Sequence, residues 1–579
     1  MPPNGIPSYR FPARGSNHMV VAGHYLAAAA GLRILEQGGN AIDAGVASGI
    51  AVNVTMPHWT SFAGVAPIII YLAGEDEVVT ISGVGRWPKA ATLEYFRDTY
   101  GEIPVGVARS AVPGACDAWL RALELYGTMT FEQAVQPALE LAEGGFPASE
   151  SFVSRIKDHE KFLSANPGSR ELFLPDGKRL ELGQHFVQKD LAGVFRGMIE
   201  AERAGSGNGR EDGVHAARDF FYKGEVAEKM VRFALEQGGL ITMEDFADFS
   251  VKVEKPETGT YKDYTLFTCG PWCQGPSLIE VLNLIEGYDL KSMAHNSAEY
   301  IHIFTEAVKL AFSDRDAYFG DPEFVEVPMA GLLSKEYAAE RRKTLDTSKA
   351  WPEQPPPGNP WPFQGVDRPA ARGVNVPELA AAPMMSDTAS TCAVDRWGNA
   401  FAATFSDSFT ATPIVPGLGL IISSRGGQSW LDPELPNCMG PWKRPRITPN
   451  PAIAFKGGKL FMPFATPGTD AQVQAMAQMF VNLVDFGRTP QQAVEEPRFN
   501  SFSFPGSYWP HAYHPGMVQL EGRIAEEVGA GLTRLGHTVE WCPDWTWDAG
   551  GLCGIMVHPK WGTLEGAADL RKECYAIGG

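Results

Sequence analysis

The sequence from Ser386 to Thr404, SDTASTCAVDRWGNAFAAT, constrains the fold of this chain more than any other stretch. A long proline-rich connector precedes it. Two short runs typical of β-strands follow the connector, and the turn residues 395–399 join them. The pattern therefore predicts a β-hairpin, with Thr388 at the junction between the connector and the first strand.

The position of Thr388 suggests a chemical role. A threonine hydroxyl is a weak nucleophile unless a base lies beside it, and one arrangement uses the threonine's own α-amine. A cut between Asp387 and Thr388 would free that amine, whose reference pKa of roughly 7.7 to 8.0 leaves much of it neutral near physiological pH. One residue would then supply both nucleophile and base. On the residues alone, an ordinary threonine that opens a strand remains the alternative.

Length and charge exclude several classes of function. The chain has 579 residues, enough for a large buried core. Its formal net charge of -19 repels phosphate backbones, so we expect no nucleic-acid partner. No run of about 18 apolar residues occurs, and residues 1–19 lack a basic patch followed by an apolar core. We therefore expect no membrane contact and a cytoplasmic location.

The sequence shows no motif for a cofactor or a metal ion. The eight cysteines lack the paired spacing of zinc sites, and three residues separate Cys269 from Cys273, so reduced thiols are expected. Residues 83–88 contain a glycine pair but neither the third glycine nor the βαβ unit of a nucleotide site. His511 and His514 lie in a proline-flanked loop without an obvious carboxylate partner, so a metal role is not expected.

Hydrophobic periodicity predicts helices and strands along the whole chain. Helices are expected at residues 24–36, 41–52, 115–126 and 471–485, and strands at 68–72, 451–455 and 459–464. Asn296 and Glu299 form a pattern typical of a capping box, at the start of a further helix that Gly320 ends. Together these elements predict a layered α+β sandwich. Residues 345–387 carry many prolines without hydrophobic periodicity, which is typical of a functional or mobile segment and equally of a plain surface linker.

Several blocks of the chain resemble the γ-glutamyltransferase family, in the family's order, from about residue 21 to residue 571. Residues 27–44 are similar to its N-terminal motif, and residues 306–322 to a second block. Thr388, Val394, Asp395, Gly398 and Asn399 match its nucleophile segment. The resemblance implies an N-terminal nucleophile hydrolase with a four-layer αββα sandwich.

The same resemblance implies that the protein is made as one chain that cleaves itself. The expected products are a large piece, residues 1–387 with the proline-rich tail 345–387, and a small piece, residues 388–579. Cleavage between Asp387 and Thr388 would release that tail. The two pieces are expected to stay together, either as one pair or as a dimer of such pairs.

Four residues are predicted to form the catalytic centre. Thr388 is the nucleophile, and Ser406 aligns with a family threonine whose hydroxyl touches the nucleophile. Gly468 and Thr469 precede a predicted helix, whose first amides have no intrahelical partner and can bind an oxyanion. The family has a Gly-Gly pair at this place, and a backbone amide survives the change to Thr469. A simple helix N-cap by Thr469 or Asp470, and a solvent-facing strand-end serine at position 406, are the alternatives.

Five residues are predicted to bind the substrate: Ser408, Gln428, Thr448, Arg86 and Arg425. By resemblance, the first two stand near the positions that bind the glutamyl ammonium, yet neither carries a negative charge. An unpaired ammonium in a partly buried site costs roughly 1 to 3 kcal/mol or more, which disfavours glutathione. The fork of an arginine suits a carboxylate, so Arg425 and Arg86 are candidate partners of the substrate acid. A structural ion pair is the alternative role for Arg425.

The combined reading is an amidohydrolase that cleaves a small-molecule amide of a carboxylic acid without an α-amine. In this it resembles the family branches that act on oxamate, glutaryl or cephalosporin amides. An authentic γ-glutamyl transferase or hydrolase is one rival. A homologue that never cleaves itself and only binds a ligand is the other.

Overall fold

The computed structural model of the chain describes residues 8–374 and 388–579. Within these residues, no helix combines the length and the apolar character needed to cross a membrane. The architecture is built on two seven-stranded sheets that lie face to face, with helices on both outer sides.

The first sheet has the order β21-β2-β10-β11-β3-β4-β7. Its strands are β21 (Tyr575–Gly578), β2 (Met19–Ala22), β10 (Ala389–Val394), β11 (Ala400–Phe405), β3 (Ile68–Leu72), β4 (Glu77–Ile81) and β7 (Val253–Glu254). Strands from both sides of the predicted cleavage point share this sheet, because β10 pairs with β2 on one edge and with β11 on the other. The two expected pieces are therefore hydrogen-bonded to each other through a continuous sheet.

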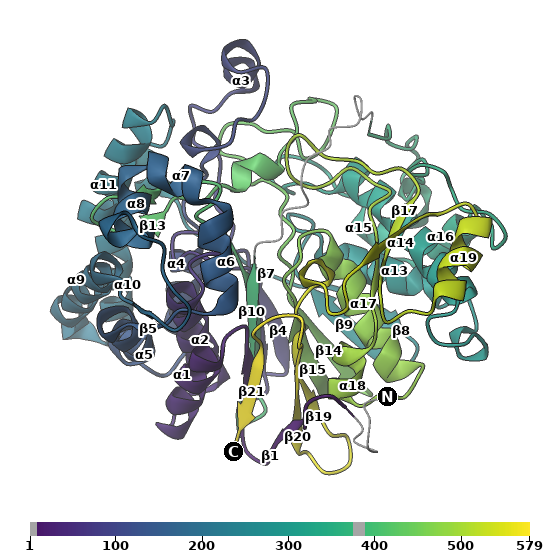
Figure 1. The fold of residues 1–579 in the computed structure, drawn as a ribbon, viewed down its shortest axis with the longest axis horizontal. Helices are drawn as coiled ribbons and strands as arrows, with labels where there is room; N and C mark the ends of the chain where they lie inside the picture. The colour runs from purple at the N-terminus through teal and green to yellow at the C-terminus, as the bar shows by residue number, and fades with distance from the viewer. Residues whose placement is uncertain (1–7, 375–387) are drawn as a thin grey trace.

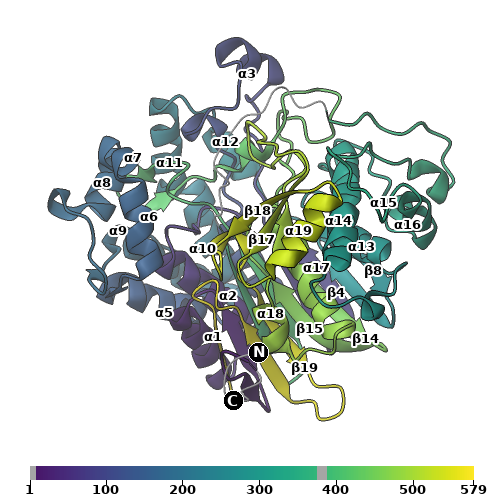
Figure 2. The same cartoon turned by 45° about the vertical axis from the view of Figure 1, so that its right-hand side comes forward.

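The second sheet has the order β1-β20-β19-β15-β14-β9-β8. Its strands are β1 (Ala13–Gly15), β20 (Leu564–Ala568), β19 (Cys553–Val557), β15 (Lys459–Ala465), β14 (Ala452–Lys456), β9 (Tyr264–Thr268) and β8 (Glu257–Tyr261). The predicted hairpin around Gly457 and Gly458 is confirmed, and both glycines take the positive φ that a tight turn requires. A smaller sheet, β16 (Phe499–Ser501), β17 (Met517–Glu521) and β18 (Thr538–Cys542), lies outside these layers with α19 (Glu526–Arg534) (Figure 2).

Two helical layers enclose the paired sheets (Figure 1). The layer on the first sheet contains α1 (Tyr25–Glu36), α2 (Ala41–Thr55), α4 (Ala115–Tyr126), α5 (Phe131–Gly144), α6 (Glu150–Asp158), α9 (Lys189–Gly205), α10 (Arg210–Lys223) and α11 (Glu225–Glu236). The layer on the second sheet contains α13 (Gly275–Ile285), α14 (Ala298–Tyr318), α17 (Ala471–Val484) and α18 (Pro490–Glu495). The four-layer αββα sandwich predicted from the sequence is confirmed.

The hairpin of β10 and β11 is buried on both faces, and its side chains alternate between two cores. Cys392 and Val394 face the second sheet, where they pack with residues such as Ile453 and Ile555. The opposite face meets α2, where the hydroxyl oxygens of Ser48 and Thr391 lie 2.9 Å apart. This double burial fixes the start of β10, where Thr388 lies.

Helix α2 can approach the sheet closely because many of its side chains are small. A Cβ atom on Gly45 would stand 2.2 Å from the ring of Phe401, and one on Gly49 would stand 2.5 Å from the ring of Trp119. Neither position has room for a methyl group. The two glycines of α2 are therefore required by its packing against the sheet at Phe401 and against α4 at Trp119.

The predicted cap of α14 was wrong by one residue. Ser297 is the cap, and its hydroxyl accepts a hydrogen bond from the Tyr300 amide at 3.2 Å. Asn296 instead has a φ of +56° and donates its side-chain amide to the Pro497 carbonyl at 2.9 Å. Asparagine tolerates this left-handed conformation better than most residues, which places it in the turn before the helix.

The proline-rich connector is described as far as residue 374 and packs along α14. Its regular structure over that range is a short 3₁₀ turn at Trp361–Gln364. Ser313 donates to the Pro355 carbonyl at 2.6 Å, and the Tyr318 hydroxyl donates to the Gly358 carbonyl at 2.7 Å. The rest of the predicted tail, including Asp387 at the expected cleavage point, lies outside the described residues.

Candidate active site

Thr388 lies at the entry to β10, directly opposite the end of β11. The register pairs Ala389 with Phe405, so the residues just beyond this pair, Thr388 and Ser406, are also neighbours. Their hydroxyl oxygens lie 2.9 Å apart, and both side chains are buried. The structure thus brings the predicted nucleophile and the predicted supporting hydroxyl into hydrogen-bond contact.

Three residues that are predicted site residues or directly follow one have unusual backbone conformations. Thr388 has a φ of +148°, Asp407 of +98° and Thr469 of +49°. Side chains with a Cβ atom rarely adopt positive φ, and each such residue costs on the order of 1–3 kcal/mol. Strained residues of this kind cluster at functional sites because the surrounding structure must hold them in place. The cluster supports a functional reading of Thr388 over that of an ordinary strand residue.

Arg425 and Asp407 form a fully buried ion pair beside Ser406. The Arg425 Nε atom lies 3.2 Å from the Asp407 carboxylate. Both side chains are fully buried. The guanidinium also donates to the hydroxyl groups of Ser406 and Tyr508. Arg425 therefore has the ion-pair role that the sequence left as the alternative, and its contact with a substrate carboxylate stays a prediction.

The carboxylate of Asp407 is occupied on both oxygen atoms. One oxygen accepts from the hydroxyl of Ser423 at 2.7 Å. The other accepts from the hydroxyl of Ser424 at 2.9 Å and from its amide at 3.2 Å, and it is the oxygen that lies 3.2 Å from Arg425 Nε in the ion pair. The strained loop that carries Asp407 is thus held by the short segment 423–425.

Gln428 and Thr448 lie together on the far side of Arg425. The Gln428 amide nitrogen donates to the Thr448 hydroxyl at 3.1 Å, and its oxygen accepts from Arg425 at 3.4 Å. This brings two of the predicted substrate-binding residues to the same place as the nucleophile, through Arg425 and Ser406. The pair is buried and offers neutral polar groups only.

Gly468 and Thr469 precede α17, as predicted. The alternative reading, a helix cap by Thr469 or Asp470, holds for position only, because Asp470 is the N-cap residue of α17 but its side chain forms no cap hydrogen bond. Asp470 is turned away from the helix start and accepts from Ser507 and Arg315, each at 2.6 Å. Among the described backbone groups, the amides of residues 468 and 469 donate no hydrogen bond to another main-chain carbonyl. They are therefore available to stabilise an oxyanion.

A buried charged network lies beneath this turn. Arg315 donates to Asp470 and, at 3.0 Å, to the side-chain oxygen of Gln274. Burial favours the neutral acid, but Arg315 and Ser507 outweigh it and hold the pKa of Asp470 below its usual range. Burial, together with the neighbouring Arg315, lowers the pKa of Arg446 to about 10. The network keeps Asp470 ionised and so fixes the backbone that carries the candidate oxyanion donors.

Gln274 links the two sides of the site. Its side-chain nitrogen donates to the carbonyl of Thr448 at 3.0 Å and to the carbonyl of Thr469 at 2.8 Å. The sequence analysis did not identify Gln274, Asp407 or Tyr508. Asp407 directly follows the predicted Ser406, and this adjacency is the sequence signal that could have identified it. Gln274 and Tyr508 reach the site from distant segments, and no local pattern marks them.

Two other predicted residues have contacts of their own. The Ser408 hydroxyl lies 3.0 Å from the Thr410 hydroxyl and accepts from the Thr410 amide at 3.2 Å. Arg86 donates to both oxygens of Glu323, at 2.9 and 3.0 Å, and to the Trp442 carbonyl at 2.8 Å. Among the described contacts, neither side chain touches Thr388, so their substrate roles stay predictions.

One group of side chains has ligand types suited to a metal ion: His302, Glu306 and His537. Their ligand atoms lie within 4.8 Å of one another and are buried. The two imidazoles are 2.8 Å apart, and the Lys309 ammonium lies 2.6 Å from the Glu306 carboxylate. The group also contacts the start of the connector, since His302 lies 2.8 Å from the Asp346 carbonyl, while His537 Nδ1 has no hydrogen-bond partner among the described residues.

The Ser406 hydroxyl can be tested directly. We expect Ser406→Ala to slow self-cleavage about tenfold, because one hydrogen bond to the Thr388 hydroxyl is worth on the order of 1 kcal/mol. The measurement is the fraction of cut chain over time after synthesis. Ser390→Ala is the matched control, since the buried Ser390 hydroxyl has no hydrogen-bond partner among the described residues. Equal cleavage rates for the two variants would contradict the role given to Ser406.

Comparisons with known proteins agree on one family. The model of the gamma-glutamyltranspeptidase family matches residues 27–579. The glutathione hydrolase-like YwrD proenzyme of Bacillus subtilis is 30% identical over 97% of this chain and 99% of its own length. The acylase ACY 1 proenzyme of Pseudomonas sp. strain SE83 is 32% identical over 97% of this chain and 93% of its own. The crystal structure of a cephalosporin acylase from Bacillus halodurans superposes with a TM-score of 0.85 and 26% identity, covering 100% of this chain and 99% of that one.

Proposed function

The chain belongs to the gamma-glutamyltranspeptidase family, and we propose that it is an amidohydrolase whose nucleophile is Thr388, freed by self-cleavage after Asp387. The observation that carries the proposal is the 2.9 Å contact between the hydroxyls of Thr388 and Ser406. The relatives are named as hydrolases and acylases and are made as proenzymes, which supports amide hydrolysis after processing. The proposed products are residues 1–387 and 388–579.

In the proposed self-cleavage, the hydroxyl oxygen of Thr388 attacks the carbonyl carbon of Asp387. The bond between that carbon and the Thr388 nitrogen breaks, the nitrogen takes up a proton, and an ester joins the two residues. Water then hydrolyses the ester, which restores the hydroxyl and leaves a free α-amine on Thr388. The positive φ of Thr388 places backbone strain next to the bond that breaks, so its release favours the step.

In the proposed turnover, the free α-amine takes the hydroxyl proton while the oxygen attacks the amide carbonyl of the substrate. The amides of Gly468 and Thr469 stabilise the negative charge that develops on the carbonyl oxygen. The substrate amine leaves with a proton, and water hydrolyses the acyl-enzyme to release the acid. Ser406, held by Arg425, orients the nucleophile throughout.

The proposed acid is small and lacks an α-amine. A glutamyl ammonium needs a carboxylate partner, but the buried Asp407 is already occupied by Arg425 and the 423–425 segment. Gln428 and Thr448 supply neutral hydrogen bonds only. Breaking the Asp407 contacts to bind an ammonium would remove the Asp407 carboxylate from the buried guanidinium of Arg425.

A substrate panel tests this specificity. We expect the cut protein to release aniline from the anilides of simple carboxylic acids at least about tenfold faster, in kcat/KM, than from γ-glutamyl anilide. The reason is that the site offers no carboxylate partner for the α-ammonium of the γ-glutamyl group. Glutaryl anilide is the matched control, because it differs from γ-glutamyl anilide only by the absence of the α-amine. Faster release from γ-glutamyl anilide would instead establish the rival, an authentic γ-glutamyl enzyme.

A further inference from the structure

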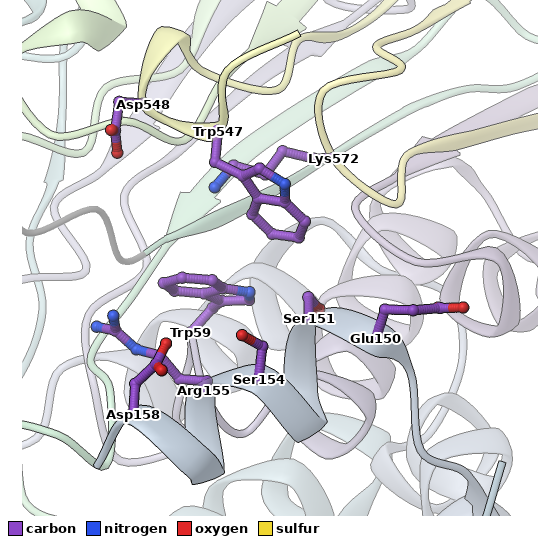
Figure 3. A pocket seen from close by; sticks show the side chains of 9 residues that line it. All are labelled: Trp59, Glu150, Ser151, Ser154, Arg155, Asp158, Trp547, Asp548 and Lys572. Atoms are coloured by element: carbon purple, nitrogen blue, oxygen red, sulfur yellow. The ribbon is translucent and has the colours of Figure 1, made fainter. Parts of the chain in front are cut away.

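A pocket of about 410 Å³ opens between α6 and the segment around residues 547–572. Two tryptophans, Trp59 and Trp547, form its apolar walls, with ring centres 6.0 Å apart (Figure 3). Trp547 is partly exposed, so part of its ring is accessible to a ligand. Two cations line the pocket, Arg155 from α6 and Lys572 from the opposite side, together with the carboxylates of Glu150, Asp158 and Asp548.

The ammonium of Lys572 is the unusual feature of this pocket. It lies 4.7 Å from the ring centre of Trp59 and 4.4 Å from that of Trp547. The residue is only 7% exposed, and within the described part of the chain its ammonium forms no hydrogen bond and no ion pair. Aromatic faces attract a cation, but they replace only part of its lost hydration. Asp548 lines the same pocket and acts on this ammonium electrostatically, but the two form no ion pair among the described contacts, so the ammonium can still contact an anionic group.

The walls of the pocket continue into the candidate active site. On one side Arg155 donates to the Thr410 hydroxyl at 3.5 Å, and that hydroxyl contacts Ser408, two residues after Ser406. On the other side, Gly550 follows the turn that carries Trp547. A Cβ atom on Gly468 would stand 3.3 Å from the Cα atom of Gly550. The pocket thus borders both the segment that supports the nucleophile and the segment that carries the oxyanion donors.

We propose that this pocket, defined by Trp59, Trp547, Arg155 and Lys572, binds the amine side of the substrate and selects a flat or aromatic group that bears a carboxylate. The proposal rests on the proposed function, in which Gln428 and Thr448 face the acid side. The flat body packs on the open face of Trp547. The carboxylate lies against the ammonium of Lys572, with the guanidinium of Arg155 across the pocket.

The test uses anilides of one simple acid that differ only in the ring substituent. We expect kcat/KM for the 4-aminobenzoate amide to exceed that for the plain anilide by about tenfold to a hundredfold. A gain of this size is typical of a hydrogen bond to a charged group. The neutral 4-aminobenzamide amide should resemble the plain anilide. In Lys572→Met the ratio of kcat/KM for the 4-aminobenzoate amide to kcat/KM for the plain anilide should fall to about one. An advantage that survives in Lys572→Met, or none in the wild type, would overturn the proposal.

The control variant is Lys560→Met, because Lys560 also lies over an indole, 4.3 Å from the ring centre of Trp561, but on the exposed surface. It should leave every substrate unaffected. Binding of 4-aminobenzoate itself can be measured through the quenching of tryptophan fluorescence, which gives a readout without turnover. If no anilide is hydrolysed yet 4-aminobenzoate binds in a Lys572-dependent way, the proposed function fails and the pocket stands. If anilides are hydrolysed equally well with and without the carboxylate, the binding role of the pocket is wrong and the proposed function stands.

The pH dependence of this preference is a second readout. Burial lowers the pKa of Lys572 to about 8, against the opposing effect of Asp548. Only the protonated amine attracts a carboxylate, so the preference should be full well below pH 8 and should fall as the pH rises through it. The other charged or titratable groups around Lys572 are Arg155, Glu150, Asp158, Asp569 and Cys574. A preference that is constant from pH 6 to pH 10 would contradict the role of Lys572.

Discussion

Thr388→Ala is expected to yield one uncut chain whose amidase activity is lower by at least about 10⁴-fold. The variant removes the hydroxyl that attacks in both proposed reactions, and without the cut it also lacks the α-amine that serves as base. The measurements are the fragment pattern of the purified protein and its kcat/KM with a simple anilide.

Two further variants make this result interpretable. Thr388→Ser keeps a hydroxyl and should be cut more slowly than the wild type, with partial activity after processing. Thr404→Val is the matched control on the neighbouring strand, since the buried Thr404 hydroxyl has no hydrogen-bond partner among the described residues and valine has the same shape. Full activity in Thr388→Ala, or an uncut chain in Thr404→Val, would contradict the assignment.

Asp407→Asn is expected to destabilise the folded chain by about 3–5 kcal/mol and to suppress self-cleavage. The change leaves the buried guanidinium of Arg425 without its carboxylate, next to the hydroxyl of Ser406. It also weakens the contacts that hold Asp407 at its positive φ. Urea denaturation monitored by tryptophan fluorescence measures the free energy of unfolding. The fragment pattern measures the self-cleavage.

An exposed ion pair provides the comparison for this variant. Arg372 and Asp432 are paired at the surface, with exposed side-chain fractions of 49% and 32%. Asp432→Asn should change stability by less than about 1 kcal/mol, as surface pairs do. Similar small losses for Asp407→Asn and Asp432→Asn would show that the buried pair does not hold the site together.

The parts of the fold that depend on local pattern could be predicted from the sequence. The hairpin after Thr388, the turn at Gly457 and Gly458, and the alanine-rich α2 follow from alternation, turn residues and side-chain size. The start of α14 shows the limit of such patterns. Asn296 and Ser297 both suit a cap, and only the contact of Asn296 with Pro497 in the folded chain decides between them.

The candidate site could be predicted only in part, for a physical reason. Thr388 and Ser406 are brought together by strand register, which a hairpin pattern determines. The partner of Arg425 could not be found, because a loop with strained φ at Asp407 creates the ion pair. Likewise, Lys572 becomes a buried cation between two indoles only after distant segments meet, and no periodicity marks that encounter.

The most direct test of the central claim is the intact mass of the purified wild-type protein, before and after brief exposure to a simple anilide. The proposed mechanism predicts two pieces that derive from the 62.8 kDa chain, the smaller one beginning at Thr388. Exposure to substrate should add one acyl group to the N-terminal residue of that piece. A single uncut chain with full activity, or an acyl group on any other residue, would contradict the claim that Thr388 is the nucleophile.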